Sequence, residues 1–281
     1  MIHISIKKYF LPISFLFILI AACSDWEQPV VLPNQGGIQS SRVLLVEEFT
    51  GASCTNCPAG NAELVSIIDK YPNNVVVVGV HSNFLGNPAV AGEPDLRTKD
   101  AMDIETFLGT WFGKPEAAFN RRKFPNKSNI RVNRPDTWIT FVEEELINAH
   151  IADLKLNITY DSLSRKVNIT LVATALENIN KPLFAHALIT ESEIFVTQLD
   201  LTGKIPNYRH EHVLRKLLTQ VGGEKIADSL AKGQSASKSF EYTLPDENVL
   251  WVAKHCSAVG FISYDSSEKY VLQAAEGKIV K

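Results

Sequence analysis

Residues 42–71 read RVLLVEEFTGASCTNCPAGNAELVSIIDKY. The stretch begins with a continuously apolar run, which is typical of a central strand covered on both faces. A polar turn then carries Cys54 and Cys57 at C-x-x-C spacing, and apolar residues at helical spacing predict a helix over 57–70. A thiol at the first turn of a helix lies beside unpaired N–H groups and the positive end of the helix dipole, which favour the thiolate. The pattern therefore predicts a redox-active cysteine pair.

A second apolar strand follows the helix closely. Residues 75–81 read VVVVGVH, and strand, helix and strand with a short connection predict a right-handed βαβ unit with a parallel strand pair. Residues 82–110 then interrupt the pattern with two X-Pro steps and a helix-like segment over 95–108. We expect this insertion to lie over one end of the sheet.

Proline marks the next two elements. Pro115 directly precedes a short apolar strand, a place where a cis X-Pro bond is kept when a tight geometry is needed. The strand pairing is expected to continue through 121–124 and to return near Ile130. Pro135 then opens a helix that is expected to end near His150, with its apolar residues on one face.

After residue 153 the hydrophobic period changes from helical to two. Two alternating runs over 154–173 predict a β-hairpin. Further strands are expected at 182–196, 238–244, 257–264 and 269–280, which together predict an antiparallel β-domain over 151–281, sandwich-like in architecture. The segment 197–237 breaks this pattern with the basic and apolar run VLRKLL, and we expect it to form a partly helical excursion.

The N-terminus is typical of an exported protein. Two lysines precede an apolar run that is too short for a membrane-spanning helix, so residues 1–22 are interpreted as a signal peptide. The run ends LIAAC, which resembles the signal of bacterial lipoproteins, and this resemblance implies that Cys23 is acylated. The alternative is ordinary cleavage that leaves Cys23 as a free thiol. Residues 23–40 lack periodicity and are interpreted as a tether.

Composition narrows the function classes. The chain has 281 residues, 45% of them hydrophobic and 21% charged, as expected for a folded protein of about two domains. Its formal net charge of −3, without a basic stripe, argues against a nucleic-acid partner. Export implies an oxidising compartment, in which the pair Cys54 and Cys57 can form a disulfide. The remaining Cys256 is interpreted as a small buried apolar residue.

Residues 41–150 resemble the thioredoxin fold in element order and in three positions. Cys54 and Cys57 lie at the strand-to-helix junction, Pro115 stands where that family keeps a cis-proline, and Glu48 stands where it carries a buried acid. The resemblance implies that Cys54 attacks, Cys57 resolves, Glu48 transfers protons and Pro115 shapes the substrate groove.

The sequence differs from the thioredoxin pattern at two places near the cysteines, so a non-catalytic scaffold remains an alternative. Ser53 replaces the usual aromatic residue, and Thr55-Asn56 replaces the usual dipeptide between the cysteines. The stretch between Val43 and Asp69 also lacks Lys, Arg and His, so any lowering of the Cys54 pKa must come from the helix N-terminus and local hydrogen bonds. A sulfur covered by the insertion or by the second domain would argue against catalysis on proteins.

Two further questions stay open: whether Glu48 or Glu47 is the buried acid, and whether the cysteine pair binds a metal. Glu47 and Glu48 are adjacent on a strand and must face opposite ways, so one of them can pair instead with an arginine at 121 or 122. The cysteine pair could alternatively bind copper or zinc together with His81, or with His210 and His212. A single C-x-x-C without a second cysteine pair is weak evidence for a metal site. His81 is interpreted as a structural residue.

Over most of the mature chain, the sequence resembles the Omp28-related lipoproteins of Bacteroidetes. The resemblance rests on EEFTGxxCxxCP at 47–58, YRHEHVLR at 208–215 and VLQA at 271–274. It implies an outer-membrane lipoprotein, facing the periplasm or the cell surface, with a thioredoxin-like domain and a β-rich C-terminal domain.

Two functions fit this resemblance. The first is a lipid-anchored thiol–disulfide oxidoreductase, which acts on protein thiols and disulfides and needs no dissociable cofactor. The second is a scaffold with a permanently closed disulfide, whose β-domain and 197–237 segment bind a protein or glycan partner.

Overall fold

The computed structural model describes residues 38, 40–109 and 112–281. The signal peptide, Cys23 and nearly all of the tether therefore lie outside the described residues, and their interpretation stays a prediction. Residues 38–281 belong to one compact unit. Among the described residues, no helix has the length and apolar content needed to span a membrane.

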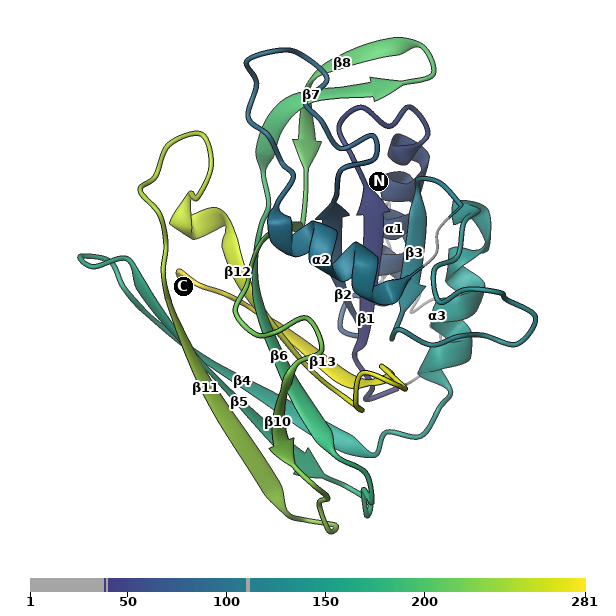
Figure 1. The fold of residues 1–281 in the computed structure, drawn as a ribbon, viewed down its shortest axis with the longest axis vertical. Helices are drawn as coiled ribbons and strands as arrows, with labels where there is room; N and C mark the ends of the chain where they lie inside the picture. The colour runs from purple at the N-terminus through teal and green to yellow at the C-terminus, as the bar shows by residue number, and fades with distance from the viewer. Residues whose placement is uncertain (1–37, 39, 110–111) are drawn as a thin grey trace, which may run out of the picture. The chain divides into compact units, whose positions relative to one another are not determined.

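The first βαβ unit is confirmed. Strand β1 (Leu44–Thr50) leads into α1 (Cys57–Lys70), and β2 (Val75–His81) returns parallel to β1. Every residue of β1 is buried, as the continuous apolar run predicts for a strand covered on both faces. Both strands point toward the same end of the sheet, where the loop between β1 and α1 lies (Figure 1).

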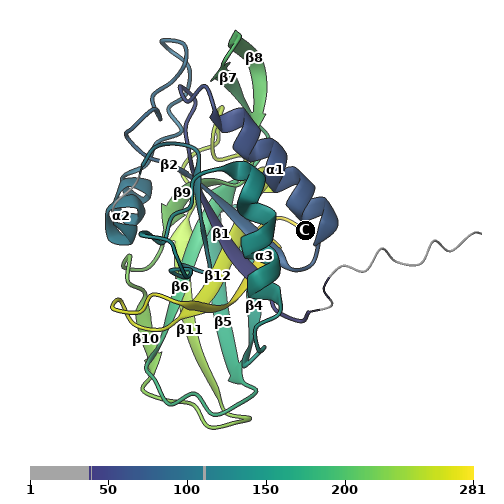
Figure 2. The same ribbon diagram turned by 90° about the vertical axis from the view of Figure 1, so that its right-hand side faces the viewer.

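Helices cover both faces of this part of the sheet. On one face, α1 and α3 (Trp138–Leu146) pack on alternate β1 residues such as Leu44 and Val46. On the other face, α2 (Lys99–Leu108) packs on Leu45 and Phe49 (Figure 2). Within the 82–110 insertion, α2 begins later than predicted because Thr98 is its N-cap, and the Thr98 hydroxyl accepts from the Ala101 N–H.

The region after α2 confirms one prediction and corrects another. The Lys114–Pro115 bond is cis, and β3 (Glu116–Phe119) runs antiparallel to β1. The strand predicted at 121–124 is wrong, because Asn120 and Arg121 adopt positive φ and end the strand. Where the chain is expected to return as a strand near Ile130, it forms only an isolated bridge between Ala117 and Val132. A 3₁₀ turn, η1 (Pro135–Thr137), then precedes α3, which ends at Leu146 rather than near residue 150.

The strands predicted in the second half of the chain are present, except that the one predicted at 182–196 is two strands, with Glu193 at positive φ between them. A three-stranded sheet has the order β11-β5-β4, from β4 (Ala152–Asp161), β5 (Lys166–Ala175) and β11 (Ser235–Thr243). The larger sheet contains β6 (Leu183–Glu191), β12 (Cys256–Ser263) and β13 (Val271–Lys278), with β10 (Glu224–Ala227) paired to β6 and η2 (Ala253–His255) leading into β12. The two sheets share an apolar core, and a Cβ added at Gly260 would lie 2.7 Å from Leu171. The sandwich-like packing is therefore present.

One large sheet runs through both halves of the chain. Strand β9 (Val213–Leu217) lies between β2 and β6, which gives the order β13-β12-β6-β9-β2-β1-β3. The predicted layout of two separate domains is therefore not confirmed, since strands from both sides of residue 150 share one sheet.

The partly helical excursion predicted at 197–237 is wrong. This segment carries most of β7 (Ile194–Asp200), then β8 (Gly203–His210), β9 and β10, without a helix among its described residues. Its basic and apolar run becomes strand β9 because β2 and β6 offer it hydrogen-bonding edges. The guanidinium of Arg215 in this strand lies 3.6 Å from the carboxylate of Glu191. Tertiary pairing thus outweighs the local preference.

Candidate functional site

Cys54 and Cys57 form a disulfide at the start of α1. Cys54 ends the loop after β1, and Cys57 is the first residue of the helix, followed by Pro58 in its first turn. The exposed fraction of each cysteine is 0%. The structure therefore places the predicted pair together, and it buries both sulfur atoms.

The loop that follows β2 lies against one side of the cysteine loop. The backbone N–H of Ser53 donates to the carbonyl oxygen of Leu85 at 3.1 Å, and the Ser53 hydroxyl donates to that of Asn87 at 2.8 Å. A Cβ added at Gly51 would lie only 2.2 Å from the Leu85 oxygen. Gly51 is therefore needed here because another backbone approaches it closely.

The β7–β8 hairpin lies against the cysteine loop as well. The side-chain nitrogen Nε2 of Gln198 donates to the carbonyl oxygens of Cys54, at 2.8 Å, and Gly51, at 3.2 Å. The backbone N–H of Leu199 donates to the Ala52 carbonyl at 2.9 Å. The hairpin and the loop after β2 lie at the end of the sheet where α1 begins (Figure 1). The cysteine loop is thus bonded to two segments, one of them from the second half of the chain.

Glu48 faces α1, and Glu47 faces the opposite side of the sheet. The Glu47 carboxylate accepts two hydrogen bonds from the buried guanidinium of Arg121, at 2.7 and 2.9 Å. A Cβ added at Gly60 would lie 2.9 Å from Oε1 of Glu48. Gly60 follows Cys57 by three residues and shares the buried face of α1 with it. Of the two adjacent acids, Glu48 is therefore the one that lies under the first turn of the cysteine helix.

Burial raises the pKa of Glu48 to about 8, and the nearby positive charge of Lys114 opposes part of this rise. At neutral pH the group is therefore mainly a neutral carboxylic acid. The Asn61 amide bridges Glu48 and the hydroxyl of Tyr208: in the orientation that satisfies both, its nitrogen donates to Glu48 at 2.9 Å and its oxygen accepts from Tyr208 at 2.7 Å.

Lys114 and Pro115 complete the surroundings of the acid. The ammonium of Lys114 donates to the carbonyl oxygen of Thr50 and to the hydroxyl of Ser82, both at 2.8 Å. Burial lowers the pKa of Lys114 to about 8. A Cβ added at Gly60 would lie 3.0 Å from the Cβ of Pro115. The proline therefore packs on the cysteine helix at Gly60, and its role in shaping a substrate groove stays a prediction.

His81 and His210 form a separate buried pair. The rings of His81 and His210 lie 5.7 Å apart, and burial holds the pKa of both below the ordinary range. The described part of the chain contains no group of three or more His, Cys, Asp or Glu side chains placed to hold a metal ion. The disulfide sulfurs also offer no thiolate ligand. The fully buried Cys256 has its pKa raised to about 12 by burial, in keeping with its interpretation as an apolar residue.

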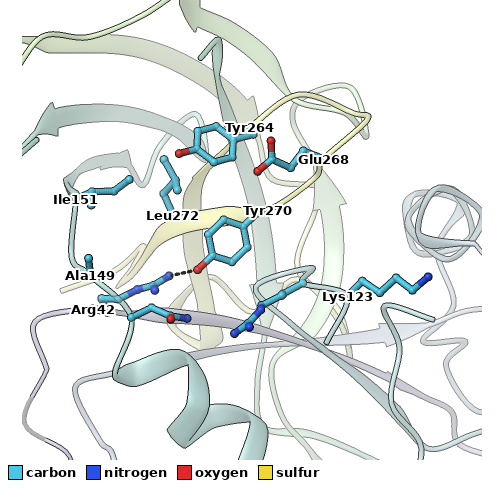
Figure 3. Close-up of a pocket in the computed structure, with 10 residues that line it drawn as sticks. Arg42, Lys123, Ala149, Ile151, Tyr264, Glu268, Tyr270 and Leu272 are labelled. Carbon is cyan, nitrogen blue, oxygen red and sulfur yellow. Dashed lines mark hydrogen bonds between the residues drawn. The ribbon is translucent and has the colours of Figure 1, made fainter. Parts of the chain in front are cut away.

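A pocket of about 550 Å³ is lined by none of these residues (Figure 3). Its wall includes Arg42, whose guanidinium donates to the Tyr270 hydroxyl at 3.0 Å. The same guanidinium pairs with the buried carboxylate of Glu145, which Arg122 also contacts, at 2.8 Å. Arg42 thus links the start of β1 to α3 and to the start of β13, and Arg122 contacts the same carboxylate of α3.

Sequence reasoning missed three residues of this site. Gln198 lies 144 positions from Cys54, and no local pattern marks it. Asn61 follows Cys57 by one helical turn and Lys114 directly precedes Pro115, so their closeness in sequence to these residues could have marked them as part of the site.

The family model described as outer membrane protein Omp28 matches residues 109–281. Among solved structures, HBP35 of Porphyromonas gingivalis is similar with a TM-score of 0.68 and 18% identity, covering 87% of this chain and 77% of that one. A structural-genomics protein of Agrobacterium tumefaciens is similar with a TM-score of 0.52 and 13% identity, covering 86% of this chain and 97% of that one. At these identities the likeness concerns the fold. No curated protein sequence matches the chain.

Proposed function

The chain belongs to the outer membrane protein Omp28 family, and from this premise we propose that it is an outer-membrane lipoprotein whose thioredoxin-like part is a non-catalytic scaffold. The single observation that carries the proposal is the complete burial of both sulfur atoms of the Cys54–Cys57 disulfide. In this role the disulfide fastens the start of α1, and the protein acts through its surface on a protein or glycan partner.

The chemistry of exchange explains why burial matters. A disulfide is opened when a thiolate attacks one of its sulfur atoms and forms a mixed disulfide, so the attacking group must reach that atom. Here the loop that carries Cys54 is held by Gln198 on the hairpin and by Leu85 in the loop after β2. Because both cysteines are fully buried, a protein thiol can reach the sulfurs only when the segments around them move.

Turnover with a protein disulfide tests the proposal. Insulin reduction by the purified protein, driven by dithiothreitol, is compared with that of Cys54→Ser. The scaffold role predicts equal rates, at the level of dithiothreitol alone. A rate that exceeds this background and disappears in Cys54→Ser contradicts the proposal.

The lipid anchor is part of the proposal and has its own test. The LIAAC sequence at 19–23 supports acylation of Cys23, and the family supports an outer-membrane location. Cys23→Ser should move the protein from the detergent phase to the aqueous phase in a detergent partition of cell envelopes, and it should abolish palmitate labelling. Unchanged partition and labelling would refute the anchor without touching the scaffold proposal.

A second candidate is a thiol–disulfide oxidoreductase whose site opens when the β7–β8 hairpin moves away. It is favoured by Glu48, a buried acid with a pKa of about 8 under the first turn of the cysteine helix, because such an acid suits proton transfer near neutral pH. If this candidate holds, Gln198→Ala should gain insulin reductase activity that depends on Cys54. An inactive Gln198→Ala protein whose hairpin has loosened would exclude it.

A further inference from the structure

A pocket of about 360 Å³ lies beside α1, and we call it the α1 pocket. One wall is the outer side of the helix and is apolar, with Pro58, Ala62, Val65 and Ile68. A size of this order suits a small molecule, and apolar walls with a few converging polar groups are typical of ligand sites.

The inner end of the α1 pocket is polar. Glu48, Asn61 and Tyr208 line it, and they come from β1, α1 and β8. Glu48 is 3% exposed and bonds through Asn61 to Tyr208. Because burial keeps Glu48 mainly protonated at neutral pH, its hydroxyl is a donor without a fixed charge.

We propose that the α1 pocket binds a small, uncharged, mainly apolar molecule with a hydrogen-bond acceptor such as a ketone or amide at one end. The apolar body lies along Ala62, Val65 and Ile68, and the acceptor meets the protonated carboxyl of Glu48. This inference goes beyond the proposed function and does not involve the disulfide.

The charges at the pocket rim support an uncharged ligand. Arg209 and Glu211 line the pocket and form an ion pair with each other, so their opposite charges largely compensate at the rim. A charged ligand would lose its hydration in an apolar pocket without gaining a charged partner. An uncharged molecule loses less and gains from burial of its apolar surface.

Binding of the neutral fluorescent ketone Prodan tests the proposal. Its naphthalene ring and ketone match the apolar wall and the donor end, and its emission reports the polarity of its surroundings. We expect saturable binding to the full mature protein with a blue shift of the emission. Ala62→Trp fills the pocket from an exposed helix position and should weaken binding by at least tenfold.

Ser66→Trp is the matched control, because Ser66 is an exposed residue of the same helix that does not line the pocket. It should bind Prodan like the wild type. Glu48→Met keeps the side-chain length but removes the donor, and we expect roughly tenfold weaker binding with circular dichroism unchanged. Equal affinity in wild type, Ala62→Trp and Ser66→Trp would overturn the proposal. An affinity unchanged in Glu48→Met would overturn the role of the carboxyl.

Discussion

The side-chain amide of Gln198 donates to the carbonyl oxygen of Cys54 at 2.8 Å, across 144 residues of sequence. This contact joins the β7–β8 hairpin to the loop that carries the disulfide. The hairpin enters from the second half of the chain, which shares a continuous sheet with the first. The backbone of the cysteine loop is therefore held in part by a segment that follows β1 by more than a hundred residues.

Loss of the Gln198 amide should expose the disulfide more often. Gln198→Ala removes hydrogen bonds to the carbonyls of Gly51 and Cys54 and leaves these acceptors without that donor. A lost buried hydrogen bond costs about 1–3 kcal/mol, so local opening should become roughly tenfold more frequent. The measurement is the rate of disulfide reduction by dithiothreitol under native conditions. Gln220→Ala, which changes a glutamine away from the cysteine loop, should reduce at the wild-type rate.

An added methyl group at Gly60 should destabilise the protein although it favours the helix. Alanine raises the helix propensity by about 1 kcal/mol relative to glycine. Its Cβ would however lie 2.9 Å from Glu48, 3.0 Å from Pro115 and 3.1 Å from Trp138. Overpacking of this kind costs about 1–3 kcal/mol, so Gly60→Ala should lower the free energy of unfolding in urea. A more stable variant would contradict the packing described here.

The buried Glu47–Arg121 pair should matter far more than an exposed pair. Glu47→Gln leaves the guanidinium of Arg121 charged and without its partner in the core, which should cost about 3–5 kcal/mol in the free energy of unfolding. The control is Asp103→Asn, which breaks an exposed ion pair with Lys99 and should cost less than about 1 kcal/mol. Similar losses in the two variants would refute the difference in burial.

Glu48 should make stability fall as pH rises. Its pKa is about 8 in the folded protein against 4.5 ordinarily, so between these values the folded state holds a proton that the unfolded chain has released. Each pH unit in this window removes up to about 1.4 kcal/mol. Lys114 has the opposite effect at higher pH. Its pKa is lowered to about 8 in the folded protein, so between about pH 8 and 10.5 the unfolded chain holds a proton that the folded state has lost, and stability rises with pH.

Urea unfolding of wild type and Glu48→Gln at several pH values between 5 and 8 measures this effect. Glutamine cannot ionise, so the stability of the variant relative to wild type should increase steadily across the window. Titrating groups that do not interact with Glu48 cancel in the comparison, and Lys114, which does interact with it, contributes mainly near the upper end of the window. A constant difference would show that Glu48 keeps an ordinary pKa.

The local elements were predictable because their signals lie within short stretches. The apolar run of β1, the helical spacing after Cys57 and the alternation over β4 and β5 each determine an element without help from distant residues. Pro115 was also recognisable from its place before β3. The resemblance to the thioredoxin fold then placed the cysteine loop, Glu48 and Pro115 in one region, which local patterns alone do not do.

The non-local features could not be predicted in this way. The run 213–218 has a mixed basic and apolar pattern, and it becomes β9 only because β2 and β6 provide edges for pairing. Burial of Cys54 depends on which segments reach its loop, and Gln198 carries no sequence signal for that role. Positive φ at Asn120 and Arg121, which ends β3, is likewise set by the folded surroundings.

The reduction rate of the native disulfide tests the central claim most directly. Dithiothreitol is added to the oxidised mature protein, free thiols are alkylated at intervals, and modified Cys54 and Cys57 are counted by mass spectrometry, with a urea-unfolded sample as reference. Burial of both sulfurs predicts reduction at least a hundredfold slower in the native protein than in urea. Reduction at the same rate in both samples would contradict the account.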